Sequence, residues 1–177
     1  MNEFFFSDAH FGHKLMCKTR NFETIEEHDE TIIKNFNSKV GADDLSYFLG
    51  DWSWTNPLEY LYRLNGRFVF INGNHDGEKI FRIKDAHKDK IIDFTFGYMD
   101  IWIEKIPITL CHFPMLHWEK SHFGAWHLFG HNHGSFIHPE GKVMNVTLDN
   151  NNLFPVSWEE VKEHMKKRSD NPDLIRR

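Results

Sequence analysis

The sequence has few cysteines and no long apolar run. Cys17 and Cys111 are the only cysteines among 177 residues, and neither belongs to a Cys-x-x-Cys pair. A disulfide framework and a structural zinc ribbon are therefore excluded, and the composition fits a reducing compartment. No stretch approaches the roughly 18 apolar residues of a membrane span, and the first residues lack the basic and apolar segments of a signal peptide. We expect a cytoplasmic protein that does not enter a membrane.

Positive charge is also scarce. The chain has 21 lysines and arginines against 26 aspartates and glutamates, which gives a formal charge of -5. A protein that mainly neutralises nucleic-acid phosphates needs a basic surface, so nucleic acid is not the favoured partner, although Lys166–Arg168 and Arg176–Arg177 leave a basic tail. Repeats, low-complexity tracts and linkers rich in Gly, Ser or Pro are absent as well. The sequence therefore predicts one domain over residues 1–168, followed by a frayed tail over residues 169–177.

Apolar segments alternate with segments of helical periodicity along the chain. Thr24-x-x-Glu27 and Ser157-x-x-Glu160 have the pattern of capping boxes that open helices. Helices are predicted over residues 24–41, 56–66 and 78–87, and from residue 157 to the basic residues 166–168. Strands are predicted over residues 3–7, 45–49, 68–71, 126–129 and 142–146, with a hairpin within residues 91–111 that turns at Glu104-Lys105. This alternation predicts an α/β fold with mixed sheets.

Thirteen histidines are the unusual feature of the composition, and several follow predicted strands. Five strand ends carry residue types that bind metals: Asp8-Ala9-His10, Gly50-Asp51, Gly73-Asn74-His75-Asp76, His112 and Gly130-His131-Asn132-His133. Because successive strand side chains alternate between faces, each i, i+2 pair is expected to point the same way. Open α/β sheets bind ligands beyond the carboxyl ends of their strands. Each motif alone is weak evidence, but together they predict one metal-binding crevice.

Taken in order, these motifs resemble those of the calcineurin-like metallophosphoesterase superfamily, from residue 4 to about residue 150. Two longer segments, Ser7–His13 and Trp126–His131, are similar to its small bacterial and phage-type members. The resemblance implies a four-layer αββα sandwich of two mixed β-sheets flanked by helices, with two metals at the strand ends. Gly50-Asp51 is followed here by Trp52-Ser53-Trp54, whereas the phosphoprotein phosphatases of the superfamily have Asp-Arg-Gly. Protein phosphatase activity is therefore not expected.

The resemblance also implies roles for single residues. One divalent metal ion would be bound by Asp8, His10, Asp51 and His133, and a second by Asp51, Asn74, His112 and His131, with Asp51 as the bridge. His75 would stabilise the transition state or protonate the leaving group. Imidazole, carboxylate and amide ligands without thiolates fit manganese, the expected metal, with iron, zinc, nickel and cobalt as alternatives.

Other residues near the motifs have two interpretations each. His13 and Arg20 are candidates for contacts with substrate phosphate. Asp76 either orients His75 or stabilises a turn, and His127 is expected to be a packed histidine. The tryptophans near the motif ends either stack a nucleobase or simply pack; they are Trp52, Trp54, Trp118 and Trp126.

The expected activity is that of a two-metal phosphoesterase. Its substrate would be a small phosphomonoester or phosphodiester, such as a nucleotide or cyclic nucleotide, attacked by a hydroxide that bridges the metals. One alternative is a nuclease of the same superfamily, which a steep salt dependence of hydrolysis would indicate. The other is a non-catalytic metal-binding scaffold. Such scaffolds typically lose ligands, whereas every expected ligand position is filled in this sequence.

Overall fold

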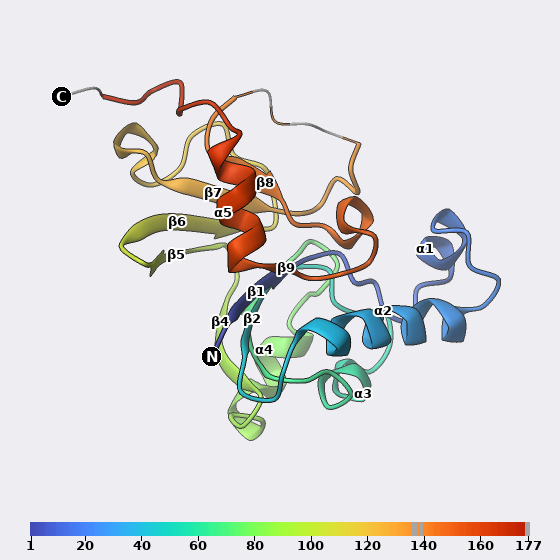
Figure 1. Ribbon diagram of the computed structural model, residues 1–177. Coiled ribbons are helices and arrows are strands. Elements are labelled where there is room, and N and C mark those ends of the chain that lie inside the picture. The colour runs from blue at the N-terminus through green and yellow to red at the C-terminus, as the bar shows by residue number, and fades with distance from the viewer. Residues whose placement is uncertain (136–137, 139, 176–177) are drawn as a thin grey trace.

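Two β-sheets form the body of the computed structural model, which describes residues 1–135, 138 and 140–175 (Figure 1). The strands of the first sheet are β1 (Glu3–Phe6), β2 (Leu45–Leu49), β3 (Arg67–Ile71), β4 (Ile91–Thr95) and β9 (Val156–Ser157). The strands of the second sheet are β5 (Tyr98–Ile103), β6 (Ile106–Cys111), β7 (Trp126–Phe129) and β8 (Val143–Asn145). Their orders are β4-β3-β2-β1-β9 and β5-β6-β7-β8.

Both sheets contain parallel and antiparallel pairs. Strands β1 to β4 run parallel, and β9 joins the edge of β1 in the opposite direction. In the second sheet β5 and β6 form an antiparallel hairpin, and β6, β7 and β8 run parallel. The hairpin turns at Glu104 and Lys105, both in the left-handed backbone region, where the sequence placed the break. The expected α/β class with two mixed sheets is confirmed.

Helices cover the two sheets unequally. The α-helices are α1 (Lys14–Thr19), α2 (Ile25–Lys39), α3 (Pro57–Leu61), α4 (Lys79–Ile83) and α5 (Trp158–Lys166). Residues of α2, α3 and α4 pack on one face of the first sheet, whereas α5 contacts β8, β9 and β1 at the sheet edges. Over the outer face of the second sheet, Trp118 from the loop after β6 packs on Phe129 and Val143. Helices therefore flank the two mixed sheets, as expected, and in the described part of the chain the loop after β6 also covers the outer face of the second sheet.

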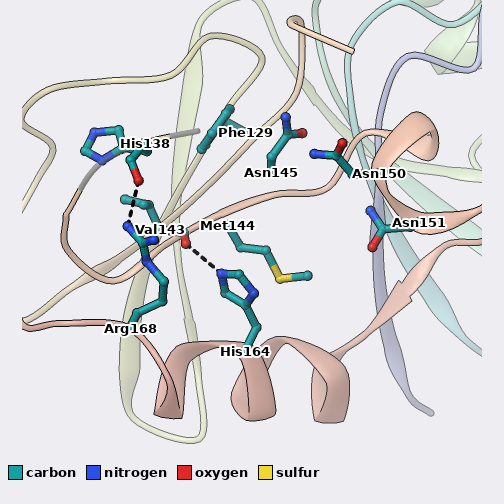
Figure 2. A pocket seen from close by; sticks show the side chains of 9 residues that line it. All are labelled: Phe129, His138, Val143, Met144, Asn145, Asn150, Asn151, His164 and Arg168. Atoms are coloured by element: carbon teal, nitrogen blue, oxygen red, sulfur yellow. Dashed lines mark hydrogen bonds between the residues drawn. The ribbon is translucent and has the colours of Figure 1, made fainter. Parts of the chain in front are cut away.

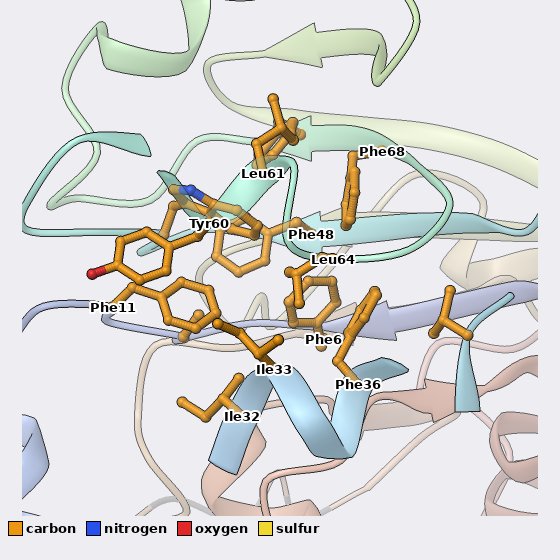
Figure 3. Close-up of a cluster of buried hydrophobic side chains, with 14 of the residues drawn as sticks. Phe6, Phe11, Ile32, Ile33, Phe36, Phe48, Tyr60, Leu61, Leu64 and Phe68 are labelled. Carbon is orange, nitrogen blue, oxygen red and sulfur yellow. The ribbon is translucent and has the colours of Figure 1, made fainter. Parts of the chain in front are cut away.

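The first sheet is buried on both faces, which explains its run of phenylalanines. Phe4 and Phe6 belong to the buried cluster that includes residues of α2, whereas Phe5, on the other face, belongs to the cluster shared with the second sheet. Figure 3 shows the cluster under α2, where the ring of Phe6 lies 4.9 Å from the rings of both Phe36 and Phe48. Such aromatic pairs contribute about 0.5–1.5 kcal/mol each beyond their area burial. This packing fixes the carboxyl ends of β1 and β2 relative to each other.

Local signals define the two longest helices. The side chain of Thr24 accepts a hydrogen bond from the backbone N–H of Glu27 at 3.0 Å, and α2 starts at Ile25, directly after Thr24. Ser157 and Glu160 form a complete capping box at the start of α5. Both N-terminal caps were predicted. Each such cap stabilises a helix by about 1 kcal/mol because it satisfies backbone donors that have no intrahelical acceptor.

Several elements differ from the sequence-based expectation. Helix α1 was not predicted, since His13 at its N-cap makes no side-chain cap and the helix has only six residues. The predicted helix over residues 78–87 is shorter and continues as a 3-10 turn, Lys84–Ala86. Strand β4 pairs with β3, so the predicted hairpin comprises only β5 and β6. The strand β9 was also not predicted, because two residues carry no detectable periodicity.

The tail after residue 168 is not frayed in the described range. Asn171 is 3% exposed, and its side-chain amide donates to the carbonyl oxygens of Ser121 and Ala125, both at 2.8 Å. The Ser121 hydroxyl donates to Asp173, and the backbone N–H of Ile175 donates to the carbonyl of His122. These long-range bonds attach the tail to the loop after β6. Residues 176–177 of the predicted frayed tail lie outside the described residues.

Candidate metal centre

The predicted ligands come together at one edge of the two sheets. Parallel strands β1, β2 and β3 present their carboxyl ends to the same side, and the loops after β6 and β7 reach this side from the second sheet. The segments that follow these strands carry all seven predicted metal ligands: Asp8, His10, Asp51, Asn74, His112, His131 and His133. Two sets, Asp8/His10/His133 and Asp8/Asp51/His112, have ligand atoms within 4.8 Å of one another.

One group of donor atoms lies around Oδ1 of Asp8. His133 Nε2 lies 3.7 Å from this oxygen, and His10 Nε2 lies 3.8 Å from it. Asp8 Oδ1 and both ring nitrogens of His10 are buried and have no hydrogen-bond partner among the described residues. Burying polar atoms without partners costs about 1–3 kcal/mol each. A cation held between the carboxylate and the imidazoles would remove this cost, so these side chains fit a metal ion.

A second group lies around Oδ1 of Asn74. This oxygen is 2.9 Å from His112 Nε2 and 3.1 Å from His131 Nδ1, and the two nitrogens are 3.3 Å apart. His112 Nδ1–H donates to the carbonyl of Leu49 at 2.7 Å, which leaves the lone pair of Nε2 facing the group. Two ligands at about 2.1 Å from a metal lie about 3.0 Å apart at an octahedral angle. The observed separations match that spacing.

Asp51 lies between the two groups. Its Oδ2 atom is 3.6 Å from His10 Nε2 and 3.5 Å from His112 Nε2. Its Oδ1 atom accepts the backbone N–H of His75 at 2.9 Å, which fixes the direction of the carboxylate. One oxygen of Asp51 therefore faces a histidine of each group, as a bridging ligand must.

The ligand-bearing segments have strained backbone. Asp8, His10, Asp51, His131 and His133 all have positive φ, between 46° and 74°. Residues other than glycine adopt this left-handed region rarely and at a cost of about 1–3 kcal/mol, and such residues cluster at functional sites. Strands β1 and β7 end before these residues, so the expected face-sharing of i, i+2 strand neighbours is wrong. The pairs converge because the loops curl in the left-handed conformation.

Glycines allow the loops to approach one another. Gly50 has φ +90°, and a Cβ atom there would lie 2.5 Å from His112 Nδ1. A Cβ atom on Gly130 would overlap the Ser7 hydroxyl and lie 2.6 Å from Asp8 Oδ2. Any larger residue at either position would push a ligand out of place. The glycines of the sequence motifs are therefore required by the packing of ligand loops, not only by tight turns.

Burial and charge keep the Asp8 carboxylate ionised. Burial by itself raises the pKa of Asp8, but the contacts with His10, His112 and Ser7 lower it below its usual range. Burial and the neighbouring His112 lower the pKa of His131, which favours its neutral form. An ionised Asp8 carboxylate beside a neutral His131 imidazole is the protonation state that metal binding requires.

Arg20 makes hydrogen bonds that stabilise the segments carrying the predicted ligands. Its Nε and Nη2 atoms donate to Asp149 at 2.9 Å and 2.7 Å, and Asp149 Oδ2 in turn accepts Nδ1–H of His133 at 2.7 Å. The other Arg20 donors contact the carbonyls of Asp8 and Ala9 and the ring of His28. With all five N–H groups engaged, Arg20 has no donor left for substrate phosphate, so the predicted substrate contact is wrong. Asp149, which orients a predicted ligand, was missed because nothing local in the sequence marks it.

We expect Asp149→Asn to weaken metal binding at the His133 group by about 10- to 100-fold, because a carboxylate that orients and polarises a ligand histidine has effects of this size. Isothermal titration of the chelator-treated protein with Mn²⁺ measures this. Asp93→Asn, an exposed position on β4, is the matched control. Unchanged affinity in the Asp149 variant would show that the Arg20–Asp149–His133 contacts have no influence on ligation.

His75 and His13 lie at the rim of the site. The His75 side chain is exposed, and its ring lies 6.0 Å from the ring of His10 and 4.7 Å from that of Trp54. The His13 ring lies 5.5 Å from His10 and stacks on Trp54 at 3.8 Å. His75 is therefore next to the predicted ligands without being one of them. His13 is placed at the same opening.

Two further residues have structural roles. The carboxylate of Asp76 accepts the backbone N–H groups of Asp51, Trp52 and Gly73 at 2.6–2.8 Å, so it stabilises the turns that carry ligands. His127 Nδ1–H donates to the carbonyl of Thr109, and its Nε2 accepts the N–H of Met115. Burial lowers the pKa of His127 to about 4. It is a neutral, packed histidine, as expected.

A separate pocket lies between β8 and α5 (Figure 2). Two polar side chains of its wall are hydrogen-bonded to the backbone. His164 Nε2–H donates to the carbonyl of Val143, and Arg168 donates to the carbonyls of His138 and Gly141. Asn145 from its wall donates to Asn132, which lies between two predicted ligands. The pocket therefore lies next to the loop after β7, and none of the residues that line it is a predicted metal ligand.

No helix in the described range combines the length and the apolar content needed to cross a bilayer.

No family model matches the chain. The chain is 35% identical over 164 residues to the uncharacterized protein MJ1445 of Methanocaldococcus jannaschii, which covers 85% of this chain and 84% of that protein. It is 40% identical over 94 residues to the Gene 66 protein of Mycobacterium phage L5, over 49% of this chain and 45% of the phage protein. The Gene 66 protein of Mycobacterium phage D29 is 26% identical over 161 residues, 77% and 80% of the two chains.

A solved structure has a similar fold. The crystal structure of the protein of unknown function AQ665 from Aquifex aeolicus superimposes with a TM-score of 0.67, over 92% of this chain and 98% of that one, at 23% identity. At this identity the likeness extends to the two-sheet α/β fold alone.

Proposed function

From the geometry of its metal centre we propose that this chain, which belongs to the family of the uncharacterized Methanocaldococcus jannaschii protein MJ1445, is a two-metal phosphoesterase. Its substrate is a small phosphomonoester or phosphodiester. The observation that carries the proposal is the position of Asp51, one of whose oxygens faces His10 of one ligand group and His112 of the other. A carboxylate shared by two ligand groups is the arrangement of a binuclear site. We also propose that the two-sheet fold is that of the metallophosphoesterases.

The donor set favours particular metals. Within the seven ligands, four imidazoles, two carboxylates and one amide oxygen are present, and thiolates are absent. Such a set binds manganese, iron, cobalt, nickel and zinc, of which manganese is the expected ion. Two divalent ions would supply positive charge for the phosphoryl oxygens and lower the pKa of a bound water. Only two aspartates oppose that charge, so the loaded site would attract a phosphate group.

The chain itself determines how a substrate can approach. Asp8, His10 and His112 are at most 2% exposed, so the inner wall of the site is closed to water. Asn74 and His75 are exposed, and His131 is partly exposed, so the site opens on their side. We propose that a ring nitrogen of His75, at this opening, gives its proton to the oxygen of the leaving group. Asp51 fixes the backbone of His75 by accepting its N–H.

The proposal predicts hydrolysis of bis-p-nitrophenyl phosphate or p-nitrophenyl phosphate by the purified chain. We expect activity to be lost after treatment with a chelator and restored by Mn²⁺, with about two manganese ions bound per chain by elemental analysis. If neither ester is cleaved with any of the five candidate metals while metal still binds, the chain is a metal-binding scaffold instead. Cleavage restricted to long single-stranded nucleic acid, falling steeply with salt, would favour the nuclease.

A further inference from the structure

We propose that Trp54 is a stacking platform for the base of a nucleoside phosphate, so that nucleotides or their esters are the substrate class of this site. The inference rests on the proposed function in one respect only, that the phosphate group binds at the metal centre. It assigns to Trp54 the recognition of the organic part of the substrate.

Trp54 differs from the other tryptophans near the motif ends. Trp52 is 1% exposed, and its indole N–H donates to the carbonyl of Pro57. Trp118 is 7% exposed and donates to the carbonyl of Ala125, and Trp126 packs against Trp158 with ring centroids 5.3 Å apart. Trp54 is 40% exposed. Three of these four tryptophans are therefore packing residues, and Trp54 is the one that offers its surface to solvent.

The position of Trp54 is fixed by its neighbours. Its indole stacks on His13 at 3.8 Å with an angle of 8° between the planes, and its backbone N–H donates to the carbonyl of Phe11 at 2.8 Å. A ring held in place before binding loses little conformational entropy when a ligand stacks on it. An exposed aromatic side chain braced in this way has the properties of a binding surface.

Trp54 is also adjacent to the reacting groups. Its ring centroid lies 4.7 Å from that of His75, the candidate proton donor, and 5.5 Å from that of the predicted ligand His10. The indole therefore lies directly beside the predicted metal centre. A planar group joined to the phosphate through a single sugar can reach both at once. Nucleobases fit this description, because each base has a flat π face and stacks on an aromatic side chain with about 1–3 kcal/mol.

The test compares two ligands that share the phosphate and the sugar but differ in the base. Adenosine 5′-monophosphate and ribose 5-phosphate are titrated into manganese-supplemented protein by calorimetry, and both are used as competitors of bis-p-nitrophenyl phosphate hydrolysis. We expect the nucleotide to bind about 10- to 100-fold more tightly than the sugar phosphate, the factor that one base–aromatic stack supplies.

Variants assign the difference to the indole. Trp54→Ala is expected to bring the affinity ratio of the two ligands close to 1 and Trp54→Phe to retain most of it, while ribose 5-phosphate binds each variant as it binds the wild type. Trp102→Ala, at a 59% exposed tryptophan on β5 that faces Lys120, is the matched control and should keep the wild-type ratio.

The outcomes separate the inference from the proposed function. Equal binding of both ligands to the wild type, binding of neither, or an unchanged ratio in Trp54→Ala would each overturn the stacking platform, even if both p-nitrophenyl esters are hydrolysed. A base preference that depends on Trp54, in a protein that hydrolyses neither ester, would support the platform and refute the phosphoesterase.

Discussion

Replacement of Asp51 by asparagine is expected to lower metal-dependent phosphoesterase activity by at least about 10³-fold and to reduce the metal content of both ligand groups. Asparagine keeps the size of the side chain and can still accept the N–H of His75. It removes the negative charge from the oxygen that lies 3.5–3.6 Å from His10 and His112. A bound metal stabilises a transition state by several kcal/mol, and about 4 kcal/mol corresponds to 10³-fold in rate.

Steady-state kinetics with bis-p-nitrophenyl phosphate and elemental analysis of the purified variant measure the two effects. The thermal unfolding transition should remain cooperative, because the core packing of β1 and β2 does not involve Asp51. Asp93→Asn on β4 controls for a change from aspartate to asparagine at an exposed position. A fully active Asp51→Asn protein with two metals bound would contradict the bridging position.

Replacement of His75 by alanine is expected to lower turnover by about 10²- to 10⁴-fold for substrates with a poor leaving group, while both metals stay bound. General acid catalysis contributes this much when the leaving oxygen needs a proton. The p-nitrophenolate group leaves readily without one, so p-nitrophenyl esters should be affected far less than alkyl esters. The dependence of the effect on the leaving group distinguishes a proton donor from a residue that merely shapes the site.

The His75 experiment compares kcat for a methyl and a p-nitrophenyl ester, together with metal content. His117→Ala is a suitable control because His117 is an exposed histidine that is paired with Asp173, at 3.6 Å, and not with a predicted ligand. Loss of metal from the His75 variant would mean that this residue acts as a ligand. An equal decrease for both esters would rule out proton transfer to the leaving group as its role.

Local signals explain why most of the fold could be predicted from the sequence. Strands β2 and β3 are short apolar runs with a glycine within two residues of their ends, and α2 and α5 carry N-terminal capping residues next to their periodic segments. Helix α1 has no capping side chain, and the tail after residue 168 is held by Asn171 through bonds to residues about 50 positions away. Interactions of that kind leave no pattern in a sequence window, which is why both were missed.

Which residues come together at the candidate metal centre was predictable, but their geometry was not. The seven ligands follow strands whose ends meet, so their convergence could be inferred from the sequence alone. The left-handed backbone that aims Asp8 and His10 depends on contacts with neighbouring loops, which the sequence does not reveal. Arg20 was misjudged for a similar reason, because its partner Asp149 is 129 residues away in the chain.

The positive φ values at predicted ligand positions also restrict which substitutions these positions can accept during evolution. At Asp8, His10, Asp51, His131 and His133 a replacement must tolerate positive φ. Glycine does so without strain, and asparagine and aspartate do so better than other residues. In a descendant that has lost the proposed metal function, these five positions are therefore expected to drift first toward Gly and Asn, because bulky or branched replacements would strain the backbone.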